Sequence, residues 1–267
     1  MDPFMSGNQQ LWDEWTEINF HSSSYNVAGF IANPDPLSPL IIDGIGDVAG
    51  KSLLHLQCHF GKDTLRLARM GAKVTGVDFS AKAIRYARQL AETMNLPATF
   101  IESNVYSIPQ VIDEKFDVVF TSYGVLNWLP DLDDWGKIIG QLLKPGGAFY
   151  IIECHPTLMM FDEYVTDGLQ VAYSYFHLDE PLIFPPHIGT YADPTAEVTE
   201  TEYSWQHSLS DIITPLLAAG LRLDFFREYP HVTWQALPIM VLEDNYWRLP
   251  PEYPQMPLSF AIRATKE

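Results

Sequence analysis

From residue 51 onward, short apolar stretches alternate with stretches whose apolar residues recur at helical spacing. The clearest helical pattern follows Asp131, and its apolar positions are Trp135, Ile138, Ile139, Leu142 and Leu143. Residues three or four apart lie on one face of an α-helix. We therefore expect an amphipathic helix that begins at Asp131 and buries this face.

Five apolar stretches have the length and the β-branched content of strands, and they cover residues 52–58, 73–78, 98–102, 116–121 and 148–153. The fourth is apolar at almost every position, which is typical of a strand buried on both faces of a parallel sheet. Helices are predicted between them, at residues 63–70 and after Ser80, whose hydroxyl is suited to cap a helix. Residues 144–147, Lys-Pro-Gly-Gly, predict a tight turn before the fifth strand. Strands that alternate with helices in this way predict an α/β fold with a doubly wound parallel sheet in residues 51–155.

Two segments outside this core have a different composition. Residues 1–50 are an aromatic-rich extension with a helix predicted near residues 11–18, and residues 1–4, which are typical of a vector-derived leader, are excluded from it. Residues 156–205 contain nine acidic and nine aromatic residues and no lysine or arginine. We interpret this segment as an inserted cap that covers a site, because it is too apolar to be a disordered linker.

The last part of the chain, residues 206–267, returns to regular structure. A helix is predicted at residues 208–220, and two further strands are predicted at residues 221–227 and 259–264. These strands would complete a mostly parallel, seven-stranded sheet.

The composition excludes several classes of partner. The chain has 34 acidic residues against 16 lysines and arginines, a net charge of −18, so it lacks the basic surface that nucleic acid binding requires. No apolar run reaches the length of a membrane helix. The two cysteines, Cys58 and Cys154, cannot build a disulfide framework or a paired metal site. We therefore expect a cytoplasmic protein with no metal. We also expect it to be a monomer or a homodimer.

The first two predicted strands carry a nucleotide-binding layout. The first strand leads into a turn that ends at Gly61, and the second strand ends at Asp78, 17 residues later. Ligands of doubly wound sheets bind at the carboxyl ends of such strands. A carboxylate at this place is suited to accept hydrogen bonds from two ribose hydroxyls.

These residues resemble the class I S-adenosylmethionine-dependent methyltransferase family over about residues 40–155, and more loosely to the C-terminus. The segments that match family motifs are residues 54–61 for the cofactor loop, 76–80 for ribose, 102–105 for adenine, and 116–119 and 143–147 for two strands. Their order and spacing together are specific. The resemblance implies a Rossmann-like methyltransferase fold, S-adenosylmethionine as the cofactor and S-adenosylhomocysteine as the product.

The resemblance also implies roles for residues around the adenosine part of the cofactor. Asp78 would bind the ribose hydroxyls within the ribose motif that ends at Ser80, and Phe79 would flank the adenine. Asn104 and Val105 would read the adenine edge, with the amide oxygen of Asn104 accepting from the adenine amino group.

A second group of residues would surround the methionine part. Gly61, with Gln57 and Cys58, would contact it directly, and Tyr25 would fold over the cofactor from the N-terminal extension. The residues expected beside the sulfonium and its methyl group are Thr121, Ser122 and Tyr123.

The cofactor loop departs from the family pattern. Where the family usually has acid-x-Gly-x-Gly-x-Gly, this chain has His55, Gln57, His59 and Gly61, so one of three glycines remains. The change suits either a divergent active enzyme or a degraded pocket. We favour the enzyme because Asp78 and the strand spacing are retained. A helical metal pair is not expected from His55 and His59, which lie on a strand.

Methyl transfer is an in-line displacement that depends mainly on positioning. A nucleophile that carries a proton also needs a base. Glu153 and His155, at the end of the fifth strand, are the candidates, and His155 is the first choice.

Three functions are compatible with this layout. The first is methyl transfer to a small molecule, since residues 121–124 lack the Asn/Asp-Pro-Pro-aromatic tetrad of nucleic acid methylases. The acidic, aromatic cap favours a neutral, aromatic or cationic acceptor. The second is a non-catalytic adenosyl-binding or protein-interaction module. A nicotinamide or flavin oxidoreductase ranks last, because it predicts three loop glycines.

Overall fold

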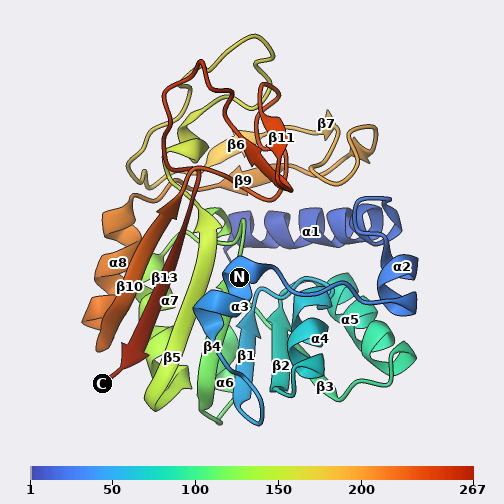
Figure 1. Ribbon diagram of the computed structural model, residues 1–267, viewed down its shortest axis with the longest axis vertical. Helices are drawn as coiled ribbons and strands as arrows, with labels where there is room; N and C mark the ends of the chain where they lie inside the picture. The colour runs from blue at the N-terminus through green and yellow to red at the C-terminus, as the bar shows by residue number, and fades with distance from the viewer. Residues whose placement is uncertain (1) are drawn as a thin grey trace.

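The computed structural model describes residues 2–267 and has a seven-stranded sheet at its centre. The strands, in spatial order, are β10 (Leu221–Tyr229), β13 (Ser259–Lys266), β5 (Leu143–Cys154), β4 (Phe116–Ser122), β1 (Ser52–Leu56), β2 (Lys73–Asp78) and β3 (Ala98–Glu102). Only β13 runs against its neighbours, β5 and β10, in this sheet (Figure 1). The predicted α/β fold with a mostly parallel seven-stranded sheet is therefore confirmed.

Helices cover both faces of the sheet. The apolar residues of α3 (Pro39–Ile45) and α4 (Lys62–Arg69) form one cluster with the sheet, and α5 (Ala81–Thr93) packs beside them. The other face is covered by α6 (Ile108–Val111), α7 (Leu132–Leu142) and α8 (Leu209–Ala218). Asp131 caps α7 through two backbone N–H groups, and Trp135 is fully buried against Phe149, as the spacing predicts.

The segment Lys144 to Gly147 does not form a separate turn. Strand β5 begins at Leu143, and its register with β4 shifts between Phe116 and Val118. Gly146 has φ +76°, a conformation in which glycine is relaxed. Residues 144–147 have no partner in β4, because the ladder passes from the pair Phe116–Leu143 to the pair Val118–Ala148. The predicted tight turn is therefore present, as an irregularity within the assigned strand β5 and not as a separate element before it.

Helix α1 (Pro3–His21) is longer than predicted and lies across the carboxyl ends of the central strands (Figure 1). The side chain of Asp2 caps it by accepting from Phe4 N, and Pro3 suits its first turn. The ring of Phe4 packs against Tyr203, with centroids 5.1 Å apart. Excluding residues 2–4 from the fold was therefore wrong, and Met1 lies outside the described residues. The short helix α2 (Val27–Ala32) follows α1.

The cap is built from two separate chain segments. The first contains the hairpins β6 (Leu182–Phe184) with β9 (Glu202–Ser204) and β7 (His187–Ile188) with β8 (Glu197–Val198). The second, residues 230–258, contains β11 (Val241–Glu243) and β12 (Tyr246–Arg248). One apolar cluster joins the two segments, with Leu158 from the first and Val232, Leu237, Met240, Leu249 and Leu258 from the second.

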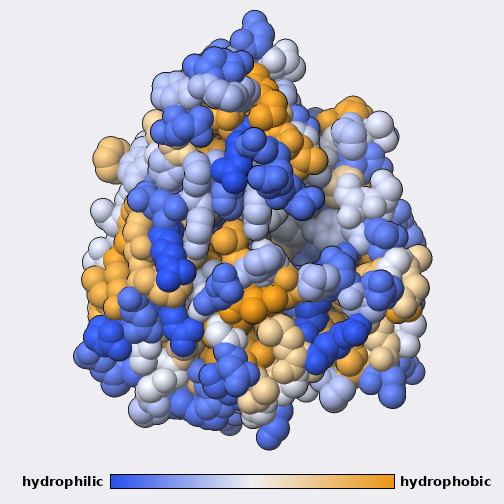
Figure 2. All heavy atoms as spheres, viewed as in Figure 1, coloured by the Kyte–Doolittle hydropathy of each residue, from blue (hydrophilic) through white to orange (hydrophobic). Residues whose placement is uncertain are grey.

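In the described part of the chain, the fold is completed by three short 3₁₀ helices: η1 (Val105–Ser107), η2 (Leu126–Trp128) and η3 (Leu158–Met160). Within residues 2–267, no helix has both the length and the apolar character needed to cross a membrane. Figure 2 shows the surface hollowed at the level of α1, between the cap and the sheet.

Candidate cofactor site

A cavity of about 330 Å³ lies at the carboxyl ends of β1, β2 and β4, beneath α1 and the cap. This is the point where the strand order reverses, between β1 and β4, and where ligands of doubly wound sheets bind. A second, much narrower cavity of about 20 Å³ adjoins it. Both cavities are lined by Gln57, Asp78, Phe79 and Trp128, so the two share a wall.

The loop after β1 keeps the backbone of a glycine loop although two of its glycine positions carry side chains. Gln57 and His59 both have φ +51°, and Gly61 has φ +78°. A left-handed conformation of this kind costs a non-glycine residue about 1–2 kcal/mol. Gly61 is required for space as well, because a Cβ atom there would lie 2.7 Å from the ring of Phe100.

Asp78 ends β2 and faces both cavities. Its carboxylate is buried and oriented by two backbone groups, accepting from His59 N at 2.8 Å and from Ser80 N at 2.9 Å. Each oxygen therefore has one hydrogen bond from the protein and capacity for another. Burial raises the pKa of Asp78 to about 6, so the group is still ionised at neutral pH.

The narrow cavity contains the two residues expected to read adenine. Asn104 and Val105 both line it, and Val105 is buried. The Oδ1 atom of Asn104 already accepts from Tyr106 N at 2.9 Å, because Asn104 caps η1. This oxygen is therefore partly committed to the protein, which the sequence did not show.

Two residues of the expected site do not line either cavity. The hydroxyl of Ser80 caps α5 by accepting from Ala83 N and donates to Asp13 of α1 at 2.6 Å. Thr121 is fully buried and donates to the carbonyl of Leu56, which ties β4 to β1. In this structure both side chains hold the elements around the site, and their contact with the cofactor stays a prediction.

Ser122 and Tyr123 do line the large cavity, together with Cys58. Tyr123 has φ +27°, and its ring packs edge-on against Trp234 of the second cap segment, with centroids 5.7 Å apart. This contact brings residues 230–258 next to the site, although the sequence assigned that segment no place near it.

Tyr25 closes the cavity together with a residue of the cap. Its hydroxyl lies 2.9 Å from that of Tyr191, which also accepts from Asn19 of α1 at 2.8 Å. Burial raises the pKa of Tyr25 to about 12. Trp12 of α1 packs against His59, with ring centroids 5.3 Å apart. Sequence reasoning missed Trp12 and Tyr191, because no local pattern marks the side of a helix or loop that faces a cavity.

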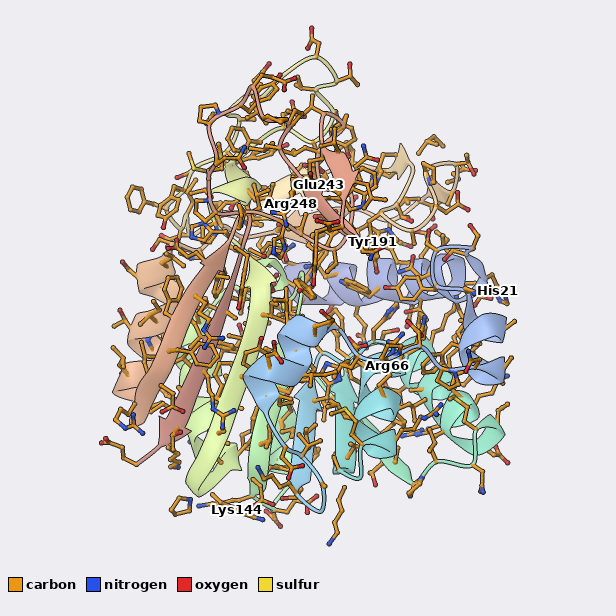
Figure 3. All side chains as sticks on the ribbon, in the orientation of Figure 1. His21, Arg66, Lys144, Tyr191, Glu243 and Arg248 are labelled. Carbon is orange, nitrogen blue, oxygen red and sulfur yellow. The ribbon has the colours of Figure 1, made fainter. Side chains whose placement is uncertain are left out.

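Charged residues at one end of the cavity come from α4. Lys62, Asp63 and Arg66 all line it. Arg66 is paired on both sides, with Asp35 and Asp63 each at 2.6 Å. Figure 3 shows Arg66 on the sheet side of α1 and Tyr191 on the cap side.

Residues 47–203 match the family model described as a methyltransferase domain. The chain belongs to this methyltransferase family. The match confirms the resemblance to class I S-adenosylmethionine-dependent methyltransferases that the motifs indicate.

Curated relatives of this methyltransferase share part of the chain. The ubiquinone biosynthesis O-methyltransferase of Photorhabdus laumondii is 32% identical over 110 residues, which are 41% of this chain and 45% of the relative. The demethylmenaquinone methyltransferase of Lactococcus lactis is 36% identical over 124 residues, 45% of this chain and 48% of the relative. The chain thus spans about half the length of the curated relatives it matches.

Solved structures agree in fold. A putative S-adenosylmethionine-dependent methyltransferase from Listeria monocytogenes has a TM-score of 0.58 at 20% identity, covering 85% of this chain and 96% of that one. An S-adenosylmethionine-dependent methyltransferase from Mesorhizobium loti has a TM-score of 0.60 at 18% identity, and the match covers 85% of this chain and 96% of that one. At this level of identity, the likeness shows a shared methyltransferase fold.

The methyltransferase cavity offers polar atoms that suit the cofactor. Three buried atoms on its walls have no hydrogen-bond partner among the described residues: Gln57 Oε1, His59 Nε2 and Tyr123 Oη. Burial lowers the pKa of His59 to about 3, so its imidazole is neutral. Buried polar groups in proteins are almost always hydrogen-bonded, so a polar ligand in the cavity would supply partners that these atoms lack. S-adenosylmethionine carries an ammonium, a carboxylate and two ribose hydroxyls, which fit this set.

His155 lies outside the cavity of the methyltransferase, although it is the first choice as a base. It is buried, its Nδ1 accepts from Thr157 N at 3.1 Å, and its Nε2 lies 3.1 Å from Glu228 Oε1. Both ring nitrogens are therefore engaged by neighbours at the end of β5. The structure does not bring His155 to the site, because the side chain turns toward β10 instead.

Glu153 has a different task from the one expected. Its carboxylate accepts from the backbone N–H groups of Gly124, Val125, Leu126 and Cys154, at 2.5, 2.7, 3.3 and 2.6 Å. Glu153 lines neither cavity. It holds the loop after β4 in place, and residues of this loop line the large cavity. Among residues 2–267, no three His, Cys, Asp or Glu side chains come close enough to hold a metal ion.

Proposed function

We propose that the protein transfers a methyl group from S-adenosylmethionine to a small-molecule acceptor. The observation that carries this proposal is Asp78, a buried and oriented carboxylate between two adjoining cavities, beside a loop that keeps the glycine-type backbone. Such a carboxylate suits the two hydroxyls of a ribose. The family match is consistent with this activity.

The chain's own residues would bind and orient the cofactor. We assign the ribose to Asp78, the adenine to the narrow cavity beside Phe79, Asn104 and Val105, and the methionine end to the large cavity. When bound, the cofactor supplies a methyl group that is activated by a positively charged sulfur. Methyl transfer then depends on how well the site aligns the acceptor, and on excluding water.

An adenine bound in the narrow cavity would need this cavity to widen. The narrow cavity holds only about 20 Å³, far less than an adenine ring occupies, and Met5 of α1 forms one of its walls. Helix α1 is held to the core by Gln9, which donates to the carbonyl of Phe79, and by Asp13. We therefore propose that the N-terminal helix shifts when the cofactor binds.

The acceptor is proposed to be neutral, aromatic or cationic. Trp12, Tyr25, Trp128 and Tyr191 supply aromatic surface, and the charges of Lys62, Arg66, Asp63 and Asp78 along the cavity cancel. The names of the two curated relatives refer to ubiquinone biosynthesis and demethylmenaquinone. Phenols and hydroquinones are therefore the first acceptors to test.

Calorimetry with S-adenosylhomocysteine, followed by turnover assays, tests this function. We expect micromolar binding, and formation of S-adenosylhomocysteine from S-adenosylmethionine only when a suitable acceptor is added. Binding without turnover across phenols, hydroquinones, amines and thiols would favour a non-catalytic adenosyl-binding module. Absence of binding would reject both functions.

A further inference from the structure

Aromatic rings from separate segments of the chain surround the large cavity. Trp12 meets the ring of Trp128 with centroids 5.3 Å apart and an interplanar angle of 80°. Tyr25 meets Tyr191 at 6.3 Å and 63°, and all four rings line the cavity. Aromatic rings pack on a planar aromatic ligand by offset stacking or by edge-to-face contact. These walls therefore suit a flat, aromatic acceptor.

The carboxylates and one histidine on the cavity wall are committed to protein partners. The Nδ1 atom of His55 shares a hydrogen bond with the hydroxyl of Thr64 at 2.8 Å, and burial lowers the pKa of this imidazole to about 4. Asp63 is paired with Arg66 at 2.6 Å. Asp78 accepts from two backbone N–H groups, and we assign it to the ribose. None of these groups is free to take a proton from an acceptor.

The remaining titratable groups on the wall are also unsuited to remove a proton. His59 Nε2 has no partner among residues 2–267, but burial lowers the pKa of this imidazole to about 3. A general base works best when its pKa lies near the working pH. Lys62 is a donor, through its ammonium group, to the carbonyl of Tyr25. Burial raises the pKa of four further groups, which therefore stay protonated at neutral pH: Tyr25, Cys58, Tyr123 and Tyr191.

A cavity with aromatic walls, and with no base among the described residues that line it, favours an aromatic nucleophile that has no proton to lose. We propose that the acceptor is a nitrogen heterocycle, which attacks the methyl carbon through a pyridine-type ring nitrogen. The lone pair of this nitrogen forms the new N–C bond, while the C–S bond breaks and its electron pair stays on sulfur. The positive charge passes from sulfur to the heterocycle, and no proton is released. The inference rests on the proposed function and names an acceptor class for the same site.

The product of this reaction also suits the cavity walls. A heterocycle that is methylated on nitrogen is a flat cation, and the faces of tryptophan and tyrosine rings attract cations. A phenol or hydroquinone would instead have to lose its hydroxyl proton, and neither Glu153 nor His155 lines the cavity. An alkyl amine is protonated at neutral pH, as a lysine side chain is, so its lone pair is not available.

Two pairs of ligands that share a ring skeleton test the acceptor class in wild type: pyridine with phenol, and isoquinoline with 2-naphthol. At pH 7 we expect kcat/KM to be at least about 10-fold higher for the heterocycle of each pair. Mass spectrometry should identify N-methylpyridinium and N-methylisoquinolinium as the products. The rate with the heterocycles should stay constant between pH 7 and pH 9, whereas the rate with the hydroxyl compounds should rise about 10-fold per pH unit as they ionise.

A product analogue tests whether the aromatic walls recognise the cation. N-methylisoquinolinium and 2-methylnaphthalene have the same shape and differ in charge, and calorimetry measures the binding of both to the complex with S-adenosylhomocysteine. We expect Trp12→Leu to lower the affinity for the cation about 3- to 10-fold more than the affinity for the neutral compound. Trp12→Phe keeps an aromatic face, so the ratio of the two affinities should stay within about 2-fold of wild type. Trp247→Leu, outside the cavity, is the matched control and should leave both affinities unchanged.

The outcomes separate the acceptor class from the proposed function. Faster turnover of phenol and 2-naphthol than of the heterocycles at pH 7 would overturn the inference and leave the proposed function standing. Equal losses of the cation and of the neutral compound in Trp12→Leu would also overturn it, because the ring would then not recognise the charge. If neither heterocycle is methylated although S-adenosylhomocysteine binds, the inference fails alone. If wild type does not bind S-adenosylhomocysteine, both the proposed function and the inference fail.

Discussion

The two walls of the cavity are built in different ways. The sheet wall consists of the loop at residues 57–63, Asp78 and the loop at residues 122–125. A backbone N–H group orients Asp78, and Glu153 holds the second loop by accepting from Gly124 N. The lid wall consists of Trp12, Tyr25 and Tyr191, which are joined by side-chain contacts. Tyr25 and Tyr191 are 166 residues apart in the chain.

This difference separates recognition from closure. Backbone hydrogen bonds between neighbouring loops hold the sheet wall in place before any ligand arrives, which is what preorganised binding requires. The lid wall depends on a hydroxyl pair and on ring contacts, such as Trp12 with Trp128 at 5.3 Å. We therefore expect changes in the sheet wall to abolish cofactor binding and changes in the lid wall to weaken it by smaller factors.

The largest effect is expected at Asp78. Replacing it with alanine removes the acceptor of both proposed ribose hydrogen bonds, so affinity for S-adenosylhomocysteine should fall more than about 100-fold by calorimetry. The ligand 5′-methylthioadenosine, which lacks the amino-acid group of the cofactor, should lose affinity by the same factor, because it keeps the ribose. Asp113→Ala, an exposed carboxylate before β4, serves as the control. A loss below 3-fold in Asp78→Ala would contradict the assignment of the sheet wall.

Asp78 also predicts opposite effects of pH on stability and on binding. Burial raises its pKa from 3.8 to about 6, so the folded protein holds this proton more tightly than the unfolded chain does. The ionised group is therefore unfavourable to folding above pH 6, and this penalty disappears as the pH falls toward 4. Relative to Asp78→Asn, wild type should lose on the order of 3 kcal/mol of unfolding free energy between pH 4 and pH 7.

Urea unfolding of the two proteins at several pH values measures this difference. Ligand affinity should change in the other direction, because the ribose hydroxyls need an ionised acceptor. Binding of S-adenosylhomocysteine should be constant above pH 7 and weaken as the pH falls through 6. A stability difference that does not change between pH 4 and pH 7 would show that the folded-state pKa of Asp78 is not raised.

A smaller effect is expected from Trp12 in the lid wall. Trp12→Ala opens the cavity toward solvent and removes ring contacts with His59 and Trp128, so affinity for S-adenosylhomocysteine should fall about 10-fold. Most of the change should be in the dissociation rate, measured by stopped-flow fluorescence of the remaining tryptophans. Trp247→Ala removes an indole from the second cap segment, outside the cavity, and should leave the rate unchanged. If Trp12→Ala lowered the affinity as much as Asp78→Ala does, the two walls would not differ in their contribution to binding.

The smallest effect is expected from Tyr191→Phe. This change removes one hydroxyl, which bonds to Tyr25 and Asn19, and leaves the ring in place. Loss of a single neutral hydrogen bond at a partly exposed position should change affinity by no more than about 3-fold. If calorimetry showed that Tyr191→Phe lowers the affinity for S-adenosylhomocysteine 50-fold or more, the description of the lid wall would be contradicted.

Several parts of the fold could be read from local sequence. The ends of β2 and β3 agree with the predicted residues, and Ser80 and Asp131 cap the helices that follow them. Each of these features depends on a short stretch of chain, through alternating burial or a cap within one turn. Asp78 could also be predicted from local sequence. It ends a parallel strand, and ligands of doubly wound sheets bind at the carboxyl ends of such strands.

Other parts depended on residues far apart in the chain. The sequence by itself determined the sheet, the loop and the acid that face a cofactor, because periodicity and capping act over a few residues. Only the tertiary structure decided that Tyr191 and Trp12 line the cavity, that His155 turns toward Glu228, and that Gln57 has a left-handed backbone. These outcomes depend on which surfaces pack together, and packing between distant segments leaves no periodic signal in the sequence.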